Sequence, residues 1–179
     1  MSGLPGSGKS TIARELAAHI QAVVLDHDDT KTTILETGVS PKQAGAASYE
    51  VIKKFPRQLT SRGLSVIIDS PCLYKELLEH GQSAAKQSGA EFRYIECVLP
   101  ELAELDKRLR ARPAKASQMR SLDEMFSHAG AEPRLGRELV KEWSGRVARP
   151  SSGVLQLDTS KPLEACLSKA VAYVSFDGS

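Results

Sequence analysis

The sequence has few aromatic residues, few cysteines and no long apolar run. Aromatic residues make up 5% of the chain, so its core must be built mostly from aliphatic side chains. The cysteines Cys72, Cys97 and Cys166 are odd in number and widely spaced, and they form no C-x-x-C pair. This pattern argues against a disulfide framework or a zinc site and is typical of reduced thiols in a cytoplasmic protein. No apolar run approaches the ~18 residues of a membrane span, so no membrane partner is expected.

A strong net charge is also absent. The chain carries 24 lysines and arginines against 22 aspartates and glutamates, a formal net charge of +2. This mild excess does not by itself indicate a partner such as nucleic acid. With 179 residues, of which 41% are hydrophobic, the chain fits one globular domain spanning residues 1–179.

The first ten residues contain a phosphate-binding motif. Gly3-Leu4-Pro5-Gly6-Ser7-Gly8-Lys9-Ser10 reads G-x-x-x-x-G-K-S, the P-loop. Its glycines let successive backbone N–H groups surround an anion. Lys9 can place its charge on the β- and γ-phosphates of ATP, and the Ser10 hydroxyl can ligate Mg²⁺. An apolar stripe through Ile12 and Leu16 predicts that a helix follows, with its N-terminus aimed at the same phosphates. Residues Gly3 to Thr11 are therefore the candidate ATP-binding residues.

Only Met1 and Ser2 precede this motif. A P-loop normally follows a buried central strand, and the loss of that strand would leave two neighbouring strands with unpaired edges. We therefore expect the first strand to be missing from this chain, either because the chain is truncated at its N-terminus or because a shortened protein folds less stably.

The rest of the chain alternates short apolar runs with helical patterns. Strands are expected at 22–26, 64–69, 92–99 and 154–158. Helices are expected at 9–21, 30–36, 42–61, 73–87, 100–112, 132–147 and from 163 onward, and Pro56 predicts a kink or a split in the third of them. This alternation predicts an α/β fold with a parallel sheet and helices on both faces, whose ligand crevice lies at the carboxyl ends of the strands.

Carboxylates follow two of the predicted strands. Asp26, Asp28 and Asp29 lie one helix and one strand after Lys9, which would bring them beside the P-loop in a parallel sheet. Asp28 could accept a proton from an attacking hydroxyl, and Asp26 could lie on the metal side. The alternative is that Asp28 or Asp29 caps the following helix, which is the preferred interpretation for Asp29. Asp69 ends the next strand and is a second candidate for Mg²⁺, with helix capping as its alternative.

A basic run extends from residue 107 to 120 without an acidic residue. Such a run is commonly a solvated helix face. Because the segment is polar and contains few large apolar side chains, we favour a mobile lid over residues 108–131 that closes on the transferring phosphates. Arg108 and Arg112 lie four residues apart, on one helix face, and are its candidate catalytic residues.

Histidines and aromatic residues give weaker signals. His27 falls in the predicted site, whereas His19, His80 and His128 are expected at the surface. Tyr49 and Phe55 could line an acceptor pocket or belong to the core, and the core is the safer expectation.

The order of these segments resembles a group of P-loop kinases. The segments that carry the resemblance are Gly3–Ser10, Leu25–Lys31, Val66–Asp69, Arg108–Arg112 and Leu157–Pro162. The group includes gluconate, shikimate and adenylyl-sulfate kinases, chloramphenicol phosphotransferase, the kinase domain of polynucleotide 5′-kinase and the AAA-domain predicted-kinase family. The resemblance covers nearly the whole chain and implies a three-layer P-loop NTPase fold.

The resemblance also implies roles for single residues. It makes Asp26 a carboxylate on the Mg²⁺ side and Asp28 the base that faces the acceptor. Arg108 and Arg112 would begin a lid over ATP, and Thr159 and Pro162 would lie near the adenine. The sequence departs from the group at three points: the strand before the P-loop is absent, Lys31 replaces an arginine of the polynucleotide kinases, and the turn at 69–74 matches none of the sugar or shikimate kinases.

Together these features predict an ATP- and Mg²⁺-dependent kinase that phosphorylates a hydroxyl group of a small molecule. The alternatives are a polynucleotide 5′-hydroxyl kinase, against which the mild charge and few aromatics argue, and a nucleotide-binding module with weak ATP hydrolysis. Residues 31–62 are expected to form the acceptor site, but no motif there names the acceptor. We expect a cytoplasmic monomer or homodimer.

Overall fold

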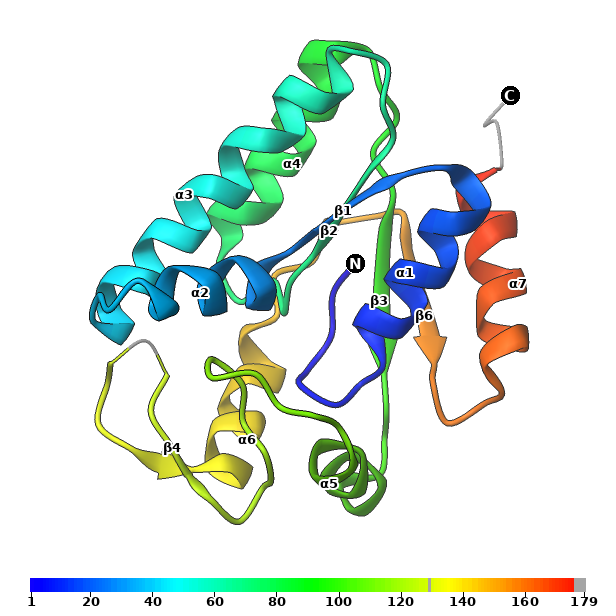
Figure 1. The fold of residues 1–179 in the computed structure, drawn as a ribbon. Coiled ribbons are helices and arrows are strands. Elements are labelled where there is room, and N and C mark those ends of the chain that lie inside the picture. The colour runs from blue at the N-terminus through cyan, green and yellow to red at the C-terminus, as the bar shows by residue number, and fades with distance from the viewer. Residues whose placement is uncertain (129, 176–179) are drawn as a thin grey trace.

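The computed structural model describes residues 1–128 and 130–175 (Figure 1). Its elements, in chain order, are α1 (Lys9–Ile20), β1 (Val23–Asp26), α2 (His27–Glu36), α3 (Pro41–Thr60), β2 (Val66–Asp69), α4 (Lys75–Ser88), β3 (Tyr94–Val98), α5 (Leu102–Ala111), β4 (Met125–Phe126), β5 (Arg134–Leu135), α6 (Gly136–Arg146), β6 (Val154–Asp158) and α7 (Leu163–Val174).

Four parallel strands form two hydrogen-bonded pairs. β1 pairs with β2 over Val23–Asp26, and β3 pairs with β6 over Tyr94–Val98. Met1 and Ser2 connect the pairs, because Met1 N donates to Ile68 O of β2 at 2.9 Å and Ser2 N donates to Ile95 O of β3 at 2.8 Å. The P-loop thus leaves the sheet between β2 and β3, at the carboxyl ends of the strands, as expected for this class of fold.

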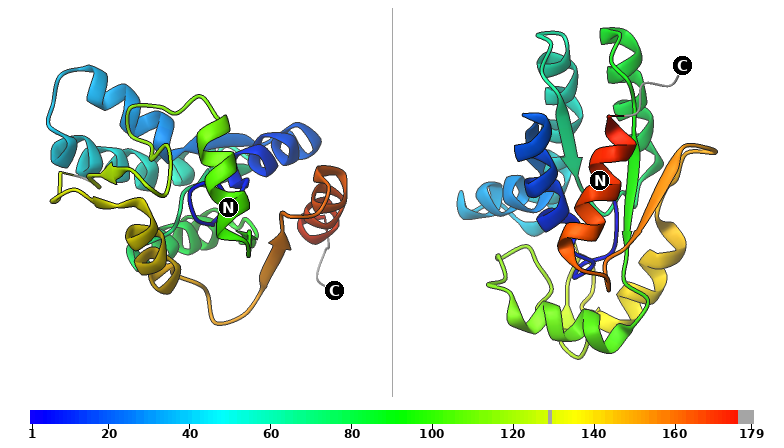
Figure 2. Two further views of the ribbon diagram at one scale, coloured as in Figure 1. Left: turned by 90° about the horizontal axis from the view of Figure 1, so that it is seen from below. Right: turned by 90° about the vertical axis from the view of Figure 1, so that its right-hand side faces the viewer.

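Helices cover both faces of these strands. Ile95 and Cys97 of β3 belong to a core cluster with Ile12 and Leu16 of α1 and Ala170 of α7. Tyr94, which points to the opposite face of the strand, packs instead with Leu78 of α4. Figure 2 shows the resulting layers, with α1 and α7 together on one side of the strands. The α/β P-loop fold with parallel strands is therefore confirmed.

A second apolar cluster lies beyond the carboxyl ends of the strands. It joins α5 and α6 to the segment between them, and its buried members are Leu73, Leu99, Leu105, Leu109, Met119, Leu122, Leu139, Val140, Trp143 and Val147. Met119 and Leu122 are 2% and 6% exposed. The expectation that residues 108–131 bury little was therefore wrong for these two side chains, which anchor the segment.

Several boundaries differ from those expected. α3 runs through Pro56 as one helix rather than splitting there, and the Thr60 hydroxyl donates to Pro56 O at 2.9 Å in its last turn. α2 begins at His27, three residues earlier than expected. The helix expected at 132–147 begins only at Gly136, because Arg134 and Leu135 pair antiparallel with Met125 and Phe126.

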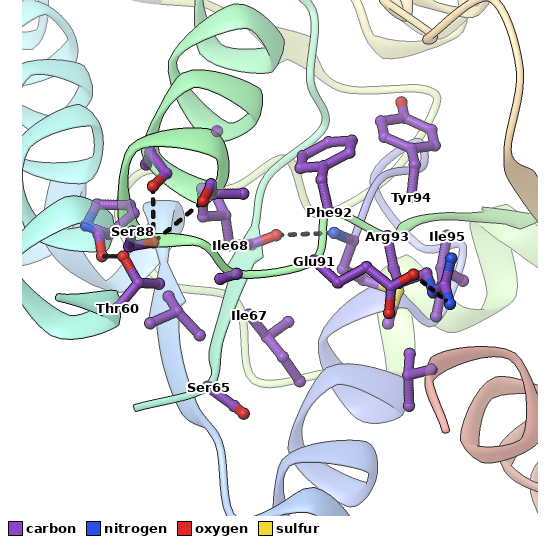
Figure 3. Close-up of a pocket in the computed structure, with 18 of the residues that line it drawn as sticks. Thr60, Ser65, Ile67, Ile68, Ser88, Glu91, Phe92, Arg93, Tyr94 and Ile95 are labelled. Carbon is purple, nitrogen blue, oxygen red and sulfur yellow. Dashed lines mark hydrogen bonds and ion pairs between the residues drawn. The ribbon is translucent and has the colours of Figure 1, made fainter. Parts of the chain in front are cut away.

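A cavity of about 500 Å³ lies beside Met1 in the gap between β2 and β3 (Figure 3). Its walls include Ile67 and Ile68 of β2, Tyr94 of β3 and Phe92, which precedes β3. Only Met1 and Ser2 occupy the strand position in this gap among the described residues. The missing first strand stays a prediction.

Candidate functional site

The P-loop is held by contacts that leave no room for side chains at two glycines. Gly3 has a φ of +140°, and a Cβ there would lie 2.5 Å from the carbonyl oxygen of Cys97. Gly6 has a φ of +83°, and its Cβ would lie 3.1 Å from the carbonyl oxygen of Leu105 in α5. Both positions therefore require glycine, for conformation and for space. Gly8, also at a φ of +83°, is the N-cap residue of α1, so the first N–H groups of that helix face the loop.

Thr159 ties the end of β6 to the P-loop. Its hydroxyl lies 2.8 Å from Ser7 O and 3.1 Å from Val98 O, and its N–H donates to Val98 O. Arg108 of α5 donates from Nη2 to Thr159 O at 2.9 Å and from Nε to Glu104 at 3.1 Å. The loop after β6, the start of the predicted lid and the P-loop are thus joined by hydrogen bonds.

A cleft of about 660 Å³ opens over the start of α1. Several of the predicted nucleotide-binding residues line it, and they come from the P-loop, β1, α5 and the loop after β6: Gly6, Gly8, Lys9, Ser10, Thr11, Asp26, Arg108, Arg112 and Thr159. Leu4 packs instead against the second apolar cluster, and Pro162 is the N-cap residue of α7 between the lining residues Lys161 and Leu163.

Asp26 caps α2, which corrects the expectation that Asp29 does so. Its Oδ1 accepts from the N–H groups of Asp28 at 2.8 Å and of Asp29 at 3.1 Å. Its Oδ2 lies 3.5 Å from Lys115 Nζ, and Lys115 also pairs with Asp29. Because of this cap, the chain passes directly from β1 into α2. The side chains of Asp26 and Asp28 therefore point in different directions.

Asp26 and Asp69 end neighbouring strands in register. Asp69 is 2% exposed, both of its carboxylate oxygens are buried without a hydrogen-bond partner among the described residues, and it does not cap α4. Burial and the nearby Asp69 carboxylate raise the pKa of Asp26, against its hydrogen bond from Asp29 and the charge of Lys115. Asp69 thus places two unpaired carboxylate oxygens beside Asp26, and carboxylate oxygens are ligands that suit a hard cation.

This arrangement suits a Mg²⁺ ion that the protein shares with the phosphates of ATP, rather than a metal ion bound by protein side chains alone. The described residues contain no cluster of three or more histidine, cysteine, aspartate or glutamate side chains able to hold a metal ion. Mg²⁺ is usually held by one or two carboxylates together with phosphate oxygens and waters. Ser10 and Asp26 both line the nucleotide cleft, whereas Asp69 lines none of the described cavities.

A second, smaller cavity of about 30 Å³ adjoins the nucleotide cleft. Lys9, Arg112 and Gln118 line both cavities, whereas Asp28 lines only this one and Asp26 lines only the nucleotide cleft. We call it the acceptor cavity. Its aromatic and apolar walls come from five segments and comprise Pro5, Tyr49, Pro71, Leu73, Met119, Phe126 and Trp143.

Asp28 is surrounded by groups that favour its ionised form. Burial by itself would raise the pKa of Asp28, but contact with His27, the charge of Lys9 and the Gln118 amide together hold it well below its usual range. His27 Nδ1 lies 3.6 Å from Asp28 Oδ1, and Gln118 Nε2 donates to Oδ2 at 2.7 Å. Asp28 is therefore a carboxylate at neutral pH.

The predicted lid segment lies across the acceptor cavity. Besides the Gln118 contact, Ser117 donates to Asp28 O at 3.2 Å and its hydroxyl lies 2.8 Å from that of Thr32. Arg112 donates to Met119 O at 2.9 Å within the segment. These contacts place the segment over Asp28, whose side chain stays 22% exposed.

Several residues lie elsewhere than expected. Phe55 is 44% exposed and does not belong to the core. Tyr49 lines the acceptor cavity, and its ring centroid lies 4.2 Å from that of the buried His27 ring, with the two rings tilted by 37°. His128 is partly buried rather than at the surface, with its ring centroid 5.0 Å from that of Trp143.

Lys31, Lys115 and Gln118 line the two cavities but were missed as site residues. For Lys115 and Gln118 the only signal in the sequence was their place in or beside the basic run.

These features define a P-loop kinase fold with a nucleotide cleft beside a smaller cavity. Comparison with known proteins agrees: residues 1–131 match the family described as "AAA domain", and the chain belongs to this family of P-loop kinases.

One curated relative is the "probable adenylyl-sulfate kinase" of Aeropyrum pernix, which is 30% identical over 115 residues, or 60% of this chain. The matched part spans 63% of that relative, less than two thirds of its length.

Two solved structures show the same fold. The adenylyl-sulfate (APS) kinase CysC of Mycobacterium tuberculosis, solved with AMPPNP and APS, matches with a TM-score of 0.61 and 17% identity over 98% of this chain and 95% of its own. A gluconokinase from Sinorhizobium meliloti matches with a TM-score of 0.61 and 15% identity over 97% of this chain and 89% of its own. Among the described residues, no helix is long and apolar enough to cross a membrane.

Proposed function

We propose that the protein is a kinase that transfers the γ-phosphoryl group of Mg²⁺-bound ATP to a hydroxyl group of a small molecule. The observation that carries this proposal is the position of Lys9, which lines both the nucleotide cleft and the acceptor cavity, with Asp28 on the acceptor side. A module that only binds or slowly hydrolyses nucleotide has no need of a second cavity that contains a carboxylate.

ATP would occupy the larger cleft. The P-loop N–H groups and Lys9 would hold the β- and γ-phosphates, and Arg108 and Arg112 would offset the charge of the group in transfer. The adenine would lie beside Thr159 and the residues that lead to Pro162. The bound AMPPNP of the mycobacterial APS kinase, which has the same fold, supports ATP as the donor.

Mg²⁺ would be held by Ser10 and Asp26, with Asp69 beside Asp26, and when bound it would neutralise charge on the phosphate oxygens. Oδ1 of Asp26 caps α2, and Oδ2 lies 3.5 Å from Lys115 Nζ. Asp26 would therefore turn Oδ2 to the metal ion while Oδ1 still caps the helix.

Asp28 would orient the acceptor hydroxyl and take its proton. As the hydroxyl oxygen bonds to the γ-phosphorus, the bond from that phosphorus to the β–γ bridging oxygen breaks, ADP leaves with the electron pair and the hydroxyl proton moves to Asp28. Because Asp28 is firmly ionised, its contribution is mainly to position the hydroxyl, with proton transfer late in the step.

The lid would open and close in each turnover. Gln118 now donates to the Asp28 oxygen that the acceptor hydroxyl would use, so the acceptor must displace this amide. The displacement would couple acceptor entry to movement of residues 108–131, and the closed lid would then exclude water from the γ-phosphate.

Incubation with ATP labelled in its γ-phosphate tests the proposal. A panel of small alcohols and a 5′-hydroxyl oligonucleotide should be offered in parallel. Transfer of label to a small alcohol supports the proposal. If label is transferred only to the oligonucleotide, and the transfer falls as salt is added, the protein is a polynucleotide 5′-hydroxyl kinase instead. If label is released only as inorganic phosphate, the protein is a nucleotide-binding module with weak ATP hydrolysis.

A further inference from the structure

Lys115 places its ammonium group on the carboxylates where Mg²⁺ is expected. This residue follows α5 in the predicted lid and lines the nucleotide cleft, as Asp26 does. Its Nζ lies 3.5 Å from Asp26 Oδ2 and also pairs with the Asp29 carboxylate. Because Asp26 Oδ1 caps α2, Oδ2 is the oxygen left for a metal ion. The protein therefore holds one of its own cations at the oxygen that Mg²⁺ would use.

The turn that carries Lys115 also carries the residue that contacts Asp28. The Gln118 N–H donates to Lys115 O at 3.0 Å, and the Lys115 N–H donates to Gln118 Oε1 at 3.3 Å. The Nε2 atom of the same amide donates to Asp28 Oδ2 at 2.7 Å. One side-chain amide thus links the backbone of Lys115 to the Asp28 carboxylate. A shift of Lys115 therefore moves the group that contacts Asp28.

The ion pairs of Lys115 are weak enough to exchange. The side chains of Lys115, Asp26 and Asp29 are 30%, 14% and 61% exposed, and partly exposed ion pairs change an equilibrium constant by about fivefold or less. Mg²⁺ carries twice the charge of an ammonium group and binds carboxylate and phosphate oxygens together. Because two cations at one carboxylate oxygen repel each other, Mg²⁺ that arrives with ATP would displace the ammonium group from Asp26.

Building on the proposed function, we propose that Lys115 is a built-in counter-cation that occupies the metal side of the site until Mg²⁺ arrives with ATP, and that this exchange frees the turn at 115–118 from both Asp26 and Asp28. Before the exchange, the ammonium group offsets the repulsion between Asp26 and Asp29. It competes with Mg²⁺, whereas Arg108 and Arg112 act on the phosphates. The proposed function places Mg²⁺ at Asp26, and this inference adds the group that the ion displaces.

The test measures how much Mg²⁺ improves the binding of a non-hydrolysable ATP analogue. The analogue is titrated calorimetrically into the full chain twice, once with excess Mg²⁺ and once with EDTA, and the ratio of the two affinities is the Mg²⁺ gain. Lys115→Met removes the competing cation and, without Mg²⁺, leaves Asp26 and Asp29 facing the phosphates uncompensated. Both effects raise the Mg²⁺ gain, and we expect a rise of about threefold or more.

Two further variants separate competition from a structural role. Lys115→Arg keeps a cation beside Asp26 and should keep most of the wild-type Mg²⁺ gain. Lys75→Met is the matched control, because it removes an exposed lysine of α4 that pairs with Glu79, and it should leave the gain unchanged. Thermal melting of each variant establishes that it is folded before the titrations are compared.

Gln118→Ala tests the link between the two carboxylates. It removes the side-chain hydrogen bonds to the Lys115 N–H and to Asp28, so Lys115 is held less firmly and the Mg²⁺ gain should rise as in Lys115→Met. When both substitutions are combined, the gain should not exceed that of Lys115→Met alone, because the two residues act through one contact. Additive effects would show that the contacts with Asp26 and Asp28 are released independently and would overturn the coupled exchange.

The outcomes distinguish this inference from the proposed function. An unchanged or lower Mg²⁺ gain in folded Lys115→Met would overturn the inference, since Lys115 would then be a structural ion pair or a ligand of the nucleotide. A raised gain without phosphoryl transfer to any alcohol would uphold the exchange and overturn the proposed function. Transfer to an alcohol with an unchanged gain would overturn the inference alone.

Discussion

Asp26 and Asp69 are in-register partners at the ends of β1 and β2, and both oxygens of Asp69 are buried without a hydrogen-bond partner among the described residues. Burial first, and then the charge of the Asp69 carboxylate, raise the pKa of Asp26. A cation brought in with ATP would relieve this repulsion. Removing the charge of Asp26 should therefore change both the free energy of unfolding and the dependence of kcat on Mg²⁺ concentration.

Asp26→Asn should lower kcat without lowering stability. Asparagine caps a helix as well as aspartate, so α2 stays capped, and the substitution removes the charge that faces Asp69. We expect the free energy of unfolding to stay within about 1 kcal/mol of the wild type or to rise. The lost activity should be partly recovered at high Mg²⁺, measured as kcat against Mg²⁺ concentration.

The control is Asp29→Asn, which changes an exposed carboxylate of the same helix turn that lies outside the nucleotide cleft. This variant should keep the wild-type dependence on Mg²⁺. If Asp26→Asn destabilised the protein and extra Mg²⁺ recovered nothing, Asp26 would be a structural cap alone.

Acid should destabilise the wild type partly through Asp28. The pKa of this group is depressed in the folded state, so its contribution to stability is present above the unfolded pKa of about 4 and is lost as the pH falls through the lower folded value. Asp28→Asn should flatten the dependence of the unfolding free energy on pH between about pH 5 and pH 2. Urea unfolding across this range measures the slope, and an unchanged slope would contradict the assigned surroundings of Asp28.

Arg108 and Arg112 should matter for turnover more than for folding. Both line the nucleotide cleft, and replacing both by alanine should lower kcat by about 10²-fold or more, because charge on the transferring group loses its stabilisation. Arg110→Ala is the matched control, since Arg110 points away to Asp106 and Asp123 on the surface.

The lid interpretation predicts that an ATP analogue protects residues 113–128 from protease in the wild type and less so in the double variant. Equal cleavage with and without nucleotide in the wild type would favour a solvated helix face.

Thr159→Val should weaken ATP binding through the P-loop. The valine keeps the shape of threonine but leaves Ser7 O without its 2.8 Å hydrogen bond, a loss on the order of 1–3 kcal/mol for a buried carbonyl. We expect ATP affinity to fall by about fivefold or more, with a lower melting temperature. Thr37→Val, at an exposed threonine beyond α2, should change neither. Calorimetric titration with ATP decides, and an unchanged affinity would show that the Thr159 hydroxyl is not needed to hold the loop.

The strand and helix order was readable because apolar runs and helical stripes alternate clearly. Boundaries failed where a tertiary contact overrode the local pattern. Residues 132–135 read as the start of a helix, yet Arg134 and Leu135 pair antiparallel with the nearby strand β4. Pro56 lacks only the hydrogen bond that its missing N–H would make, and α3 continues past it.

The nucleotide side of the site was predictable and most of the acceptor side was not. The P-loop is contiguous in sequence, so its residue types alone indicate phosphate binding. Tyr49 had been weighed as a lining residue of an acceptor pocket. The cavity also takes Phe126 and Trp143 from distant segments, and nothing local marks either of them. Lys31 was noted only as a departure from the arginine of the polynucleotide kinases, and its burial beside Asp28 could not be read from the sequence.

The most direct test of the account compares Asp28→Asn with the wild type in single-turnover transfer of labelled phosphate to an accepted alcohol. The account predicts that the rate falls by ~10²–10⁴-fold while the affinity for the ATP analogue stays within about twofold, because the lost carboxylate acts on the acceptor hydroxyl alone. A wild-type rate in the folded variant, or an equal loss in ATP affinity, would contradict the assignment of Asp28 to the acceptor side and with it the proposed transfer between the two cavities.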